Sequence, residues 1–213
     1  MELSTLYPQS QMLFLEIKSD GRVQQYLDGI RSHHEETYHH LLRVGLLSID
    51  VGFENTVTPY QLHLLGFAGI LHDVGKMHIP SYILEKDGPL DEQERAEMLS
   101  HSRLGFLALQ NFGDKNLGKI VVAHHEFQPQ AYPRSGVDRR KIPRNASERR
   151  ETDLSVPGLA QIVAAADVFD ALSCRRSYKD PLPPERVEEI LRKDYGGNPA
   201  FIDQVMKRKY IST

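Results

Sequence analysis

The chain has 213 residues with 40% hydrophobic and 26% charged side chains, which suffices for one buried core and excludes a disordered or fibrous protein. Its formal net charge is −3, whereas a general nucleic-acid-binding protein would carry a basic excess, so no nucleic-acid polymer is expected as a partner. The chain has one cysteine, Cys174, so it cannot form an intrachain disulfide, and a reducing compartment is indicated. We expect Cys174 to be a small buried residue.

Apolar residues recur at helical spacing along nearly the whole chain. The first two stripes cover residues 23–30 and 38–49. Thr58-Pro59-Tyr60-Gln61 then combines a capping residue, a proline in the first turn and a glutamine three residues after the cap. We therefore expect a third helix that begins at Thr58 and ends near Leu71.

The second half of the chain predicts further helices. Asp91 and Glu94 repeat the cap pattern ahead of a helix that runs to Leu107. A later segment, rich in alanine, valine and isoleucine, is expected to be a central and nearly buried helix. No segment alternates as a strand does, so the fold class is predicted to be all-α. The expected helices cover residues 91–107, 117–124, 156–172, 183–195 and the segment after Asn198.

Residues 127–155 form a long basic loop. They hold four prolines or glycines and seven Lys/Arg against four Asp/Glu. Loops of this length are usually functional or disordered. The cluster Arg139-Arg140-Lys141 with Arg144, Arg149 and Arg150 suits anion capture, either a nucleotide phosphate or the acidic surface of a signalling protein partner. A solvated loop remains the alternative.

The domain organisation is expected to be simple. Residues 1–35 are predicted to be an N-terminal helical extension, which acts as a cap or as an oligomer contact in a homodimer, and residues 36–213 to be the main domain. The segment Met1-Glu2-Leu3-Ser4 lacks the pattern of a secretion signal, and no run of eighteen apolar residues occurs. A cytoplasmic protein without a membrane span is expected.

The ten histidines of the chain are unevenly placed, and several lie on otherwise apolar helical faces. Burying a charged or unpaired polar group costs several kcal/mol unless a partner compensates it. Any one of these residues alone is more often an ordinary core residue or helix cap. Five separate helices each place such a group inside, and the economical explanation is a shared metal. The candidate ligands are Glu36, His40, His72, Asp73, His101, His124, His125 and Asp167.

Imidazole and carboxylate ligands suit first-row divalent ions better than calcium. Eight candidates are too many for one ion and fit two or three. A carboxylate between two sites can bridge them, and a pair of ions can clamp a phosphate and generate hydroxide at neutral pH. The absence of cysteine from the set argues against a structural thiolate site.

The segment Leu71-His72-Asp73-Val74-Gly75-Lys76 is the signature of the HD superfamily of metal-dependent phosphohydrolases. The surrounding motifs resemble the HD-GYP subfamily, whose members hydrolyse the bacterial second messenger cyclic di-GMP. The resemblance covers residues 36–207 and implies an HD-domain helical bundle with a polynuclear metal site in its core. It also implies a metal-dependent phosphodiesterase that yields pGpG and/or GMP. The matching motifs are Glu36…His40-Leu41-Leu42-Arg43-Val44, Ile79-Pro80-Ser81-Tyr82-Ile83-Leu84, Leu90…Glu94…Met98…His101, His124-His125-Glu126, Ala166-Asp167-Val168-Phe169-Asp170-Ala171-Leu172 and Arg176-Ser177-Tyr178-Lys179.

The resemblance also assigns roles. It implies the same eight metal ligands, with Asp73 as the bridge and iron as the first choice of metal, followed by manganese or another first-row ion. Lys76 is expected beside the scissile phosphate, where its charge favours the developing oxyanion, and a surface lysine is the alternative. Asp170 is expected to support a ligand or to handle a proton. Arg176 and Lys179 resemble phosphate-holding residues, with a solvated loop as the alternative.

The chain departs from the family pattern after Glu126. The family continues to Asp-Gly and then Gly-Tyr-Pro, whereas this chain keeps only Tyr132-Pro133, has Ala131 in place of one glycine and is one residue shorter. Tyr132 is retained as a candidate substrate contact, but a loop that lacks these two family glycines takes a different shape. Two alternatives to a cyclic di-GMP phosphodiesterase therefore stay open: a weakly catalytic binding or protein-interaction module, and an HD phosphohydrolase for another nucleotide.

Overall fold

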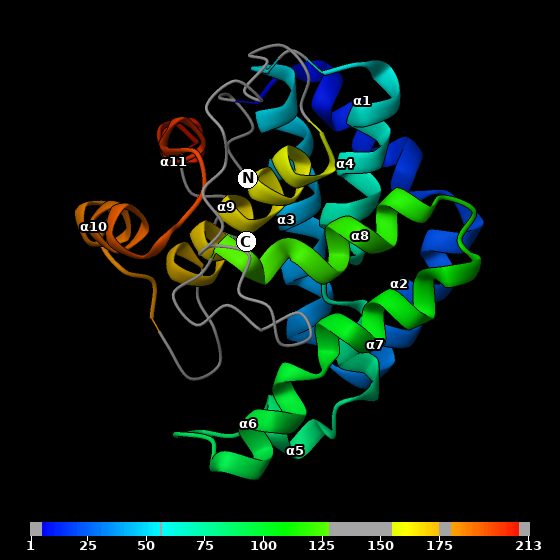
Figure 1. The fold of residues 1–213 in the computed structure, drawn as a ribbon, viewed down its shortest axis with the longest axis vertical. Coiled ribbons are helices and arrows are strands. Elements are labelled where there is room, and N and C mark those ends of the chain that lie inside the picture. Colours follow the sequence, from blue (N-terminus) through cyan, green and yellow to red (C-terminus); the bar gives the residue numbers. More distant parts are fainter. Residues whose placement is uncertain (1–5, 56, 128–154, 175–179, 209–213) are drawn as a thin grey trace, which may run out of the picture.

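The computed structural model describes residues 6–55, 57–127, 155–174 and 180–208, and every regular element in these ranges is a helix (Figure 1). The expected all-α class is therefore confirmed for this part of the chain. The α-helices are α1 (Pro8–Lys18), α2 (Gly21–His33), α3 (Glu35–Phe53), α4 (Pro59–Leu71), α5 (Ser81–Leu84), α6 (Glu92–Leu99), α7 (His101–Ala108), α8 (Lys115–Ala123), α9 (Val156–Ser173), α10 (Pro184–Asp194) and α11 (Pro199–Met206), and the short 3₁₀ helices are η1 (Val74–His78), η2 (Leu109–Asn111) and η3 (His124–Phe127).

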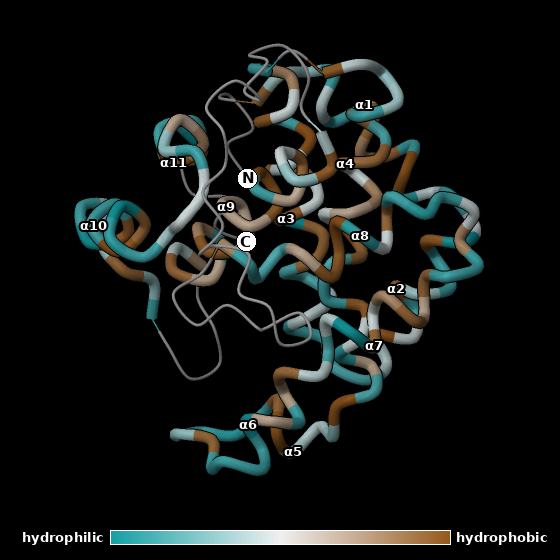
Figure 2. Tube along the Cα trace, viewed as in Figure 1, coloured by the Kyte–Doolittle hydropathy of each residue, from teal (hydrophilic) through white to brown (hydrophobic). Residues whose placement is uncertain are grey.

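The core is built around α3, α4 and α9. Helix α9 is the central buried helix that the sequence predicts, and it lies between α3, α8 and the α10–α11 pair (Figure 1). Apolar residues dominate α9 and α3, whereas the peripheral α10 is largely hydrophilic (Figure 2). A helix that is apolar on all sides must be enclosed by neighbours. By length and composition α9 could also cross a membrane, a test that the buried core helix of a globular protein passes equally.

Local caps place the two residues of the His-Asp signature. Thr58 and Gln61 form the predicted capping box at the start of α4, and the helix ends at Leu71. His72 is the C-cap, and Asp73 follows in a non-helical conformation. The α-helix therefore ends at the signature itself, and both side chains are buried at the end of α4.

The helix expected over residues 91–107 is in fact two helices. Asp91 and Glu94 form the predicted capping box, but α6 ends at Leu99. The hydroxyl of Ser100 donates to the carbonyl oxygen of Glu97, which competes with continued helical bonding. The break makes His101 the first residue of α7, and α7 can then pack along η1 in a direction of its own.

The N-terminal helices α1 and α2 pack against α3 and α4, and Ile17 and Leu27 belong to the same hydrophobic core as α9. A buried carboxylate, Asp50 on α3, ties both ends of the described chain to this core. Its Oδ1 accepts hydrogen bonds from the Tyr7 N–H and the Ser10 hydroxyl, and its Oδ2 accepts one from Arg208. The predicted N-terminal extension is therefore helical over its described part and is an integrated layer of the bundle.

Candidate metal centre and active site

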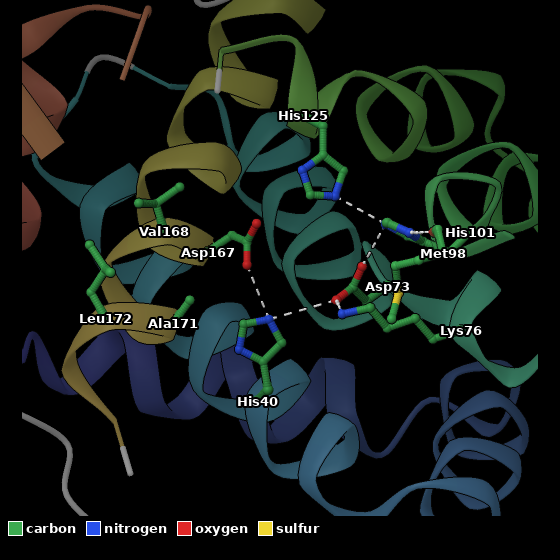
Figure 3. Close-up of a pocket in the computed structure, with 10 residues that line it drawn as sticks. All are labelled: His40, Asp73, Lys76, Met98, His101, His125, Asp167, Val168, Ala171 and Leu172. Atoms are coloured by element: carbon green, nitrogen blue, oxygen red, sulfur yellow. Dashed lines mark hydrogen bonds and ion pairs between the residues drawn. The ribbon is translucent and has the colours of Figure 1, made fainter. Parts of the chain in front are cut away.

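Seven of the eight predicted ligands converge at the ends and inner faces of five helices. Ligand atoms within each of two groups lie within 4.8 Å of one another. Five of these side chains, together with Lys76, surround one cavity (Figure 3). The first group is Asp73, His101, His124 and His125, and the second is His40, His72 and Asp167.

Asp73 lies between the two groups. Its Oδ1 is 3.0 Å from Nε2 of His101 and 3.7 Å from Nε2 of His124. Its Oδ2 is 3.4 Å from Nε2 of His72 and 3.8 Å from Nε2 of His40. Each carboxylate oxygen thus faces a different set of imidazoles, which is the arrangement that a carboxylate bridging two ions requires.

The donor set fits divalent metal ions. Among the described residues, three ligand atoms of the centre are buried without a hydrogen-bond partner: Nε2 of His72, Oδ1 of Asp73 and Nε2 of His124. Orphaned buried polar atoms are costly in a protein interior, and ions bound in the two groups would compensate all three. Nitrogen and oxygen donors together favour a first-row metal.

Three of the imidazoles are held by backbone groups close to them in the chain. In each case the Nδ1–H group donates to a backbone carbonyl oxygen three residues earlier, so Nε2 keeps its lone pair and points to the centre. These hydrogen bonds join His72 to Gly69 (2.9 Å), His101 to Met98 (2.6 Å) and His124 to Val121 (2.5 Å).

The electrostatics of the centre favour a cation. Burial opposes ionisation of both carboxyl groups, yet the charge of Lys76 holds the pKa of Asp73 well below its usual range. The neighbouring imidazole of His40 lowers the pKa of Asp167 in the same way. Burial and the neighbouring His125 keep the pKa of His124 low, so this imidazole is neutral. Two ionised carboxylates and a neutral imidazole are the protonation states that metal binding needs.

The centre opens into a cavity of about 240 Å³ (Figure 3). Lys76 lies at its edge, with Nζ 2.6 Å from Oδ2 of Asp73. Opposite the imidazoles, the wall is apolar and is formed by Val168, Ala171 and Leu172 of α9, with Met98 on the other side. The cavity therefore combines a polar floor, one cationic side chain and an apolar wall.

The remaining predicted residues are placed differently. Glu36 is half-buried one turn before His40 and belongs to neither ligand group. Asp170 is buried and does not line the cavity; burial opposes its ionisation, but hydrogen bonds from His40 and Arg43 lower the pKa of Asp170 to about 2. Cys174 is only partly buried, contrary to the expectation, and its thiol donates to Oδ1 of Asp170 at 3.2 Å.

Three predicted substrate contacts, Tyr132, Arg176 and Lys179, lie outside the described residues, as do residues 128–154 of the basic loop. Sequence reasoning assigned no role to several residues of the site, among them Met98, Arg43 and the apolar residues of the α9 wall. Met98 reaches the cavity from α6, and Arg43 contacts Asp170 from α3. The spacing of three between His40 and Arg43 is a signal that was available, because residues three apart share a helical face.

Comparisons with known proteins agree with this geometry. The family model described as HD domain matches residues 37–172. A cyclic di-GMP phosphodiesterase of Thermotoga maritima is 36% identical over 180 residues, which cover 81% of this chain and 44% of that protein. A 3'3'-cGAMP-specific phosphodiesterase 2 of Vibrio cholerae is 32% identical over 190 residues, which cover 87% of this chain and 33% of that protein. The chain thus spans less than half the length of these relatives.

A solved structure has the same fold. The HD domain of the phosphodiesterase PgpH of L. monocytogenes, crystallised with cyclic-di-AMP, aligns with a TM-score of 0.58 at 21% identity and covers 85% of this chain and 92% of that one. The fold, the buried centre of histidines and aspartates and the matched family model lead to one assignment. The chain belongs to the HD domain family, and the cyclic di-GMP phosphodiesterases among its relatives support the HD-GYP subfamily that its motifs indicate.

Proposed function

We propose that the chain is a metal-dependent phosphodiesterase that hydrolyses cyclic di-GMP to pGpG and/or GMP. The observation that carries this proposal is the position of Asp73, whose two oxygens face two separate ligand groups on the floor of an open cavity. Relatives of this chain that hydrolyse cyclic di-GMP support the choice of substrate.

Each part of the cavity has a role in this proposal. A pair of first-row ions supplies Lewis acidity and an activated water at neutral pH. His40, His72 and Asp167 would hold one ion, while His101, His124 and His125 would hold the other, with Asp73 shared. The ammonium group of Lys76, at the cavity edge, stabilises negative charge on the phosphoryl oxygens. The apolar wall of α9 offers a surface for the face of a nucleobase.

The finer assignments are also part of the proposal. Iron is the first choice of metal and manganese the second, because both suit mixed imidazole and carboxylate ligands. Glu36 would contribute to a third ion. Tyr132, Arg176 and Lys179 are proposed as substrate contacts.

The cellular setting is proposed from the sequence alone. The single Cys174 favours the reducing cytoplasm. The basic segment within residues 127–155 is proposed to receive a signalling protein, and residues 1–35 to contribute to a homodimer.

The test is a substrate panel with the purified chain. The protein is loaded anaerobically with Fe²⁺, or with Mn²⁺, and offered cyclic di-GMP, pGpG, 3'3'-cGAMP and cyclic di-AMP. We expect cyclic di-GMP to be hydrolysed, and His72→Ala and Asp73→Ala to abolish turnover. A loaded protein that leaves cyclic di-GMP intact while it cleaves another member of the panel would overturn the substrate.

A second candidate substrate is 3'3'-cGAMP, which is favoured by the relative specific for that nucleotide. The same panel ranks it directly against cyclic di-GMP. A binding module is the remaining alternative, because the segment after Glu126 lacks the glycines of the family pattern. Calorimetry that detects tight cyclic di-GMP binding without hydrolysis under Fe²⁺, Mn²⁺ and Ni²⁺ would favour that alternative.

A further inference from the structure

A second polar layer lies one helical turn away from the ligands His40 and Asp167. Arg43 follows His40 by three residues on α3, and Asp170 follows Asp167 by three residues on α9. Residues three apart share a helical face, so one pair on α3 meets the corresponding pair on α9. Helices α3 and α9 are in direct contact, which brings the two pairs together in the interior.

The contacts within this layer are short and buried. Nδ1 of His40 donates to Oδ2 of Asp170 at 2.7 Å. The guanidinium of Arg43 donates from Nε to Oδ1 at 2.7 Å and from the terminal nitrogen to Oδ2 at 3.0 Å. The side chains of Arg43 and Asp170 are 10% and 5% exposed. Planar two-point contacts of this kind between arginine and carboxylate fix orientation as well as charge.

His40 is thereby held differently from His72, His101 and His124. Those three imidazoles donate from Nδ1 to neutral backbone carbonyl oxygens three residues earlier in the chain. His40 donates to an ionised carboxylate on another helix, 130 residues away. A carboxylate partner makes an imidazole a stronger metal ligand and fixes the tautomer in which Nε2 is free. Nε2 of His40 does face the centre, 3.2 Å from Oδ1 of Asp167.

Asp170 needs Arg43 in order to act in this way. A buried carboxylate without a cationic partner is costly and turns toward whatever positive charge is near, which in a loaded centre is the metal. The two bonds from Arg43 engage both oxygens of Asp170 and hold it against Nδ1 of His40.

We propose that Arg43 is a positioning residue that acts through Asp170 on His40 and sets how tightly the ion of the His40, His72 and Asp167 group is retained. This inference rests on the metal centre that the proposed function requires. It deepens that function, because it makes one of the two metal positions dependent on a residue that belongs to neither ligand group and does not line the cavity.

The alternative is that these contacts are purely structural and only hold α3 and α9 together. If the contacts are purely structural, their removal would lower thermal stability but would leave the number of bound metal ions unchanged. The test therefore compares Arg43→Met with the charge-conserving Arg43→Lys and the near-isosteric Asp170→Asn. Arg192→Met is the matched control, because Arg192 also pairs with two carboxylates, Glu188 and Asp203, but is 48% exposed on α10.

The full chain is titrated with Mn²⁺, with calorimetry for affinity and electron paramagnetic resonance for coupling between ions. In Arg43→Met and Asp170→Asn we expect one of the two ions to bind roughly 10–100-fold more weakly, while the other is retained. The spectrum should change from a coupled pair toward an isolated Mn²⁺. Arg43→Lys should recover part of the lost affinity, and Arg192→Met should match the wild type.

Nitrogen-15 NMR spectra of the metal-free protein report which ring nitrogen of His40 carries the proton, independently of metal binding. We expect the Nδ1–H tautomer of His40 in the wild type and its loss in Asp170→Asn. If Arg43→Met does not fold, Arg43→Lys and Asp170→Asn still carry the test.

Wild-type affinity for both ions in these variants, or equal weakening of both ions, would overturn the inference. Failure of the wild type itself to bind Mn²⁺ would instead overturn the proposed function.

Discussion

Gly75 lies against the backbone of His101 so closely that no side chain fits between them. A β-carbon on Gly75 would lie 1.9 Å from the carbonyl oxygen of His101 and 2.5 Å from the backbone nitrogen of Gly105. This contact seats η1, directly after Asp73, on the first turn of α7. The 3.0 Å separation between Nε2 of His101 and Oδ1 of Asp73 depends on it. The glycine of the signature is therefore required by packing.

Gly75→Ala should separate η1 from α7, because the obstacle is backbone that cannot move aside. We expect a loss of about 1–3 kcal/mol or more in the free energy of unfolding, together with weaker metal binding. Urea unfolding and Mn²⁺ titration measure the two effects. Gly21→Ala is the control, since nothing lies within 4 Å of its added β-carbon and alanine favours the helix by about 0.5–1 kcal/mol. Unchanged metal affinity in Gly75→Ala would contradict the argument.

Metal removal should lower the melting temperature. Three ligand atoms of the centre are buried without hydrogen-bond partners among the described residues, so an ion compensates them only in the folded state. Free metal at a hundred times its dissociation constant stabilises the fold by about 2.7 kcal/mol. Differential scanning calorimetry with Mn²⁺ and with a chelator should record this shift, and His124→Ala should reduce it. Identical melting curves with and without metal would count against the centre.

Asp20 should contribute to the loss of folding stability at acid pH. This residue caps α2, and the hydrogen bond from the Arg22 side chain lowers the pKa of Asp20 from 3.8 to about 2. A lowered folded-state pKa stabilises the protein above pH 3.8, and this contribution disappears as the pH falls toward 2.

Two substitutions separate the cap from the charge at this position. Asp20→Ala should cost about 1 kcal/mol at pH 7, because the cap is lost. Asp20→Asn keeps the cap and should cost only a few tenths of a kcal/mol, because the Arg22 side chain is 55% exposed and solvent screens the pair. Urea unfolding at pH 7, 4 and 2.5 should show the difference between wild type and Asp20→Asn becoming smaller as the pH falls. A difference that grows toward low pH would reverse the assigned sign.

Arg208→Met should be strongly destabilising. The guanidinium is 3% exposed and pairs with Asp50, which is fully buried, so its removal leaves an uncompensated charge inside the protein. Breaking such a pair from one side costs about 3–5 kcal/mol. The neighbouring Lys207→Met removes a pair with Glu54 from a lysine that is 64% exposed and should change stability by less than about 1 kcal/mol.

Neutralising Asp50, the carboxylate partner of Arg208, tests the same explanation. The double variant Asp50→Asn/Arg208→Met should recover part of the loss, because the fully buried carboxylate is then neutral while the amide oxygen still accepts from Tyr7 and Ser10. Denaturant unfolding measures all of these variants. A double variant less stable than the sum of the single changes would contradict the explanation by buried charge.

Local chemistry made much of this protein predictable from its sequence. Helix starts such as Thr58 with Gln61 depend on side chains three residues from the backbone groups that they satisfy, so the pattern is visible without a fold. Seven residues that converge at the candidate metal centre could be singled out, because histidines and aspartates on apolar faces are costly without a shared partner. The break at Ser100 was missed, since one continuous apolar pattern spans both helices.

The tertiary structure decided the relations between those residues. Asp170 was predicted to act in catalysis, and its contacts with His40 and Arg43 are bonds across 130 and 127 residues that no local pattern encodes. The orientation of Asp73 between two ligand groups likewise depends on how α7 meets η1. Caps and periodicity are set by bonds within one helix, and so the sequence alone determined them. Which side chains share a charge or an ion is set by the packing of helices distant in sequence, and so only the folded chain determined it.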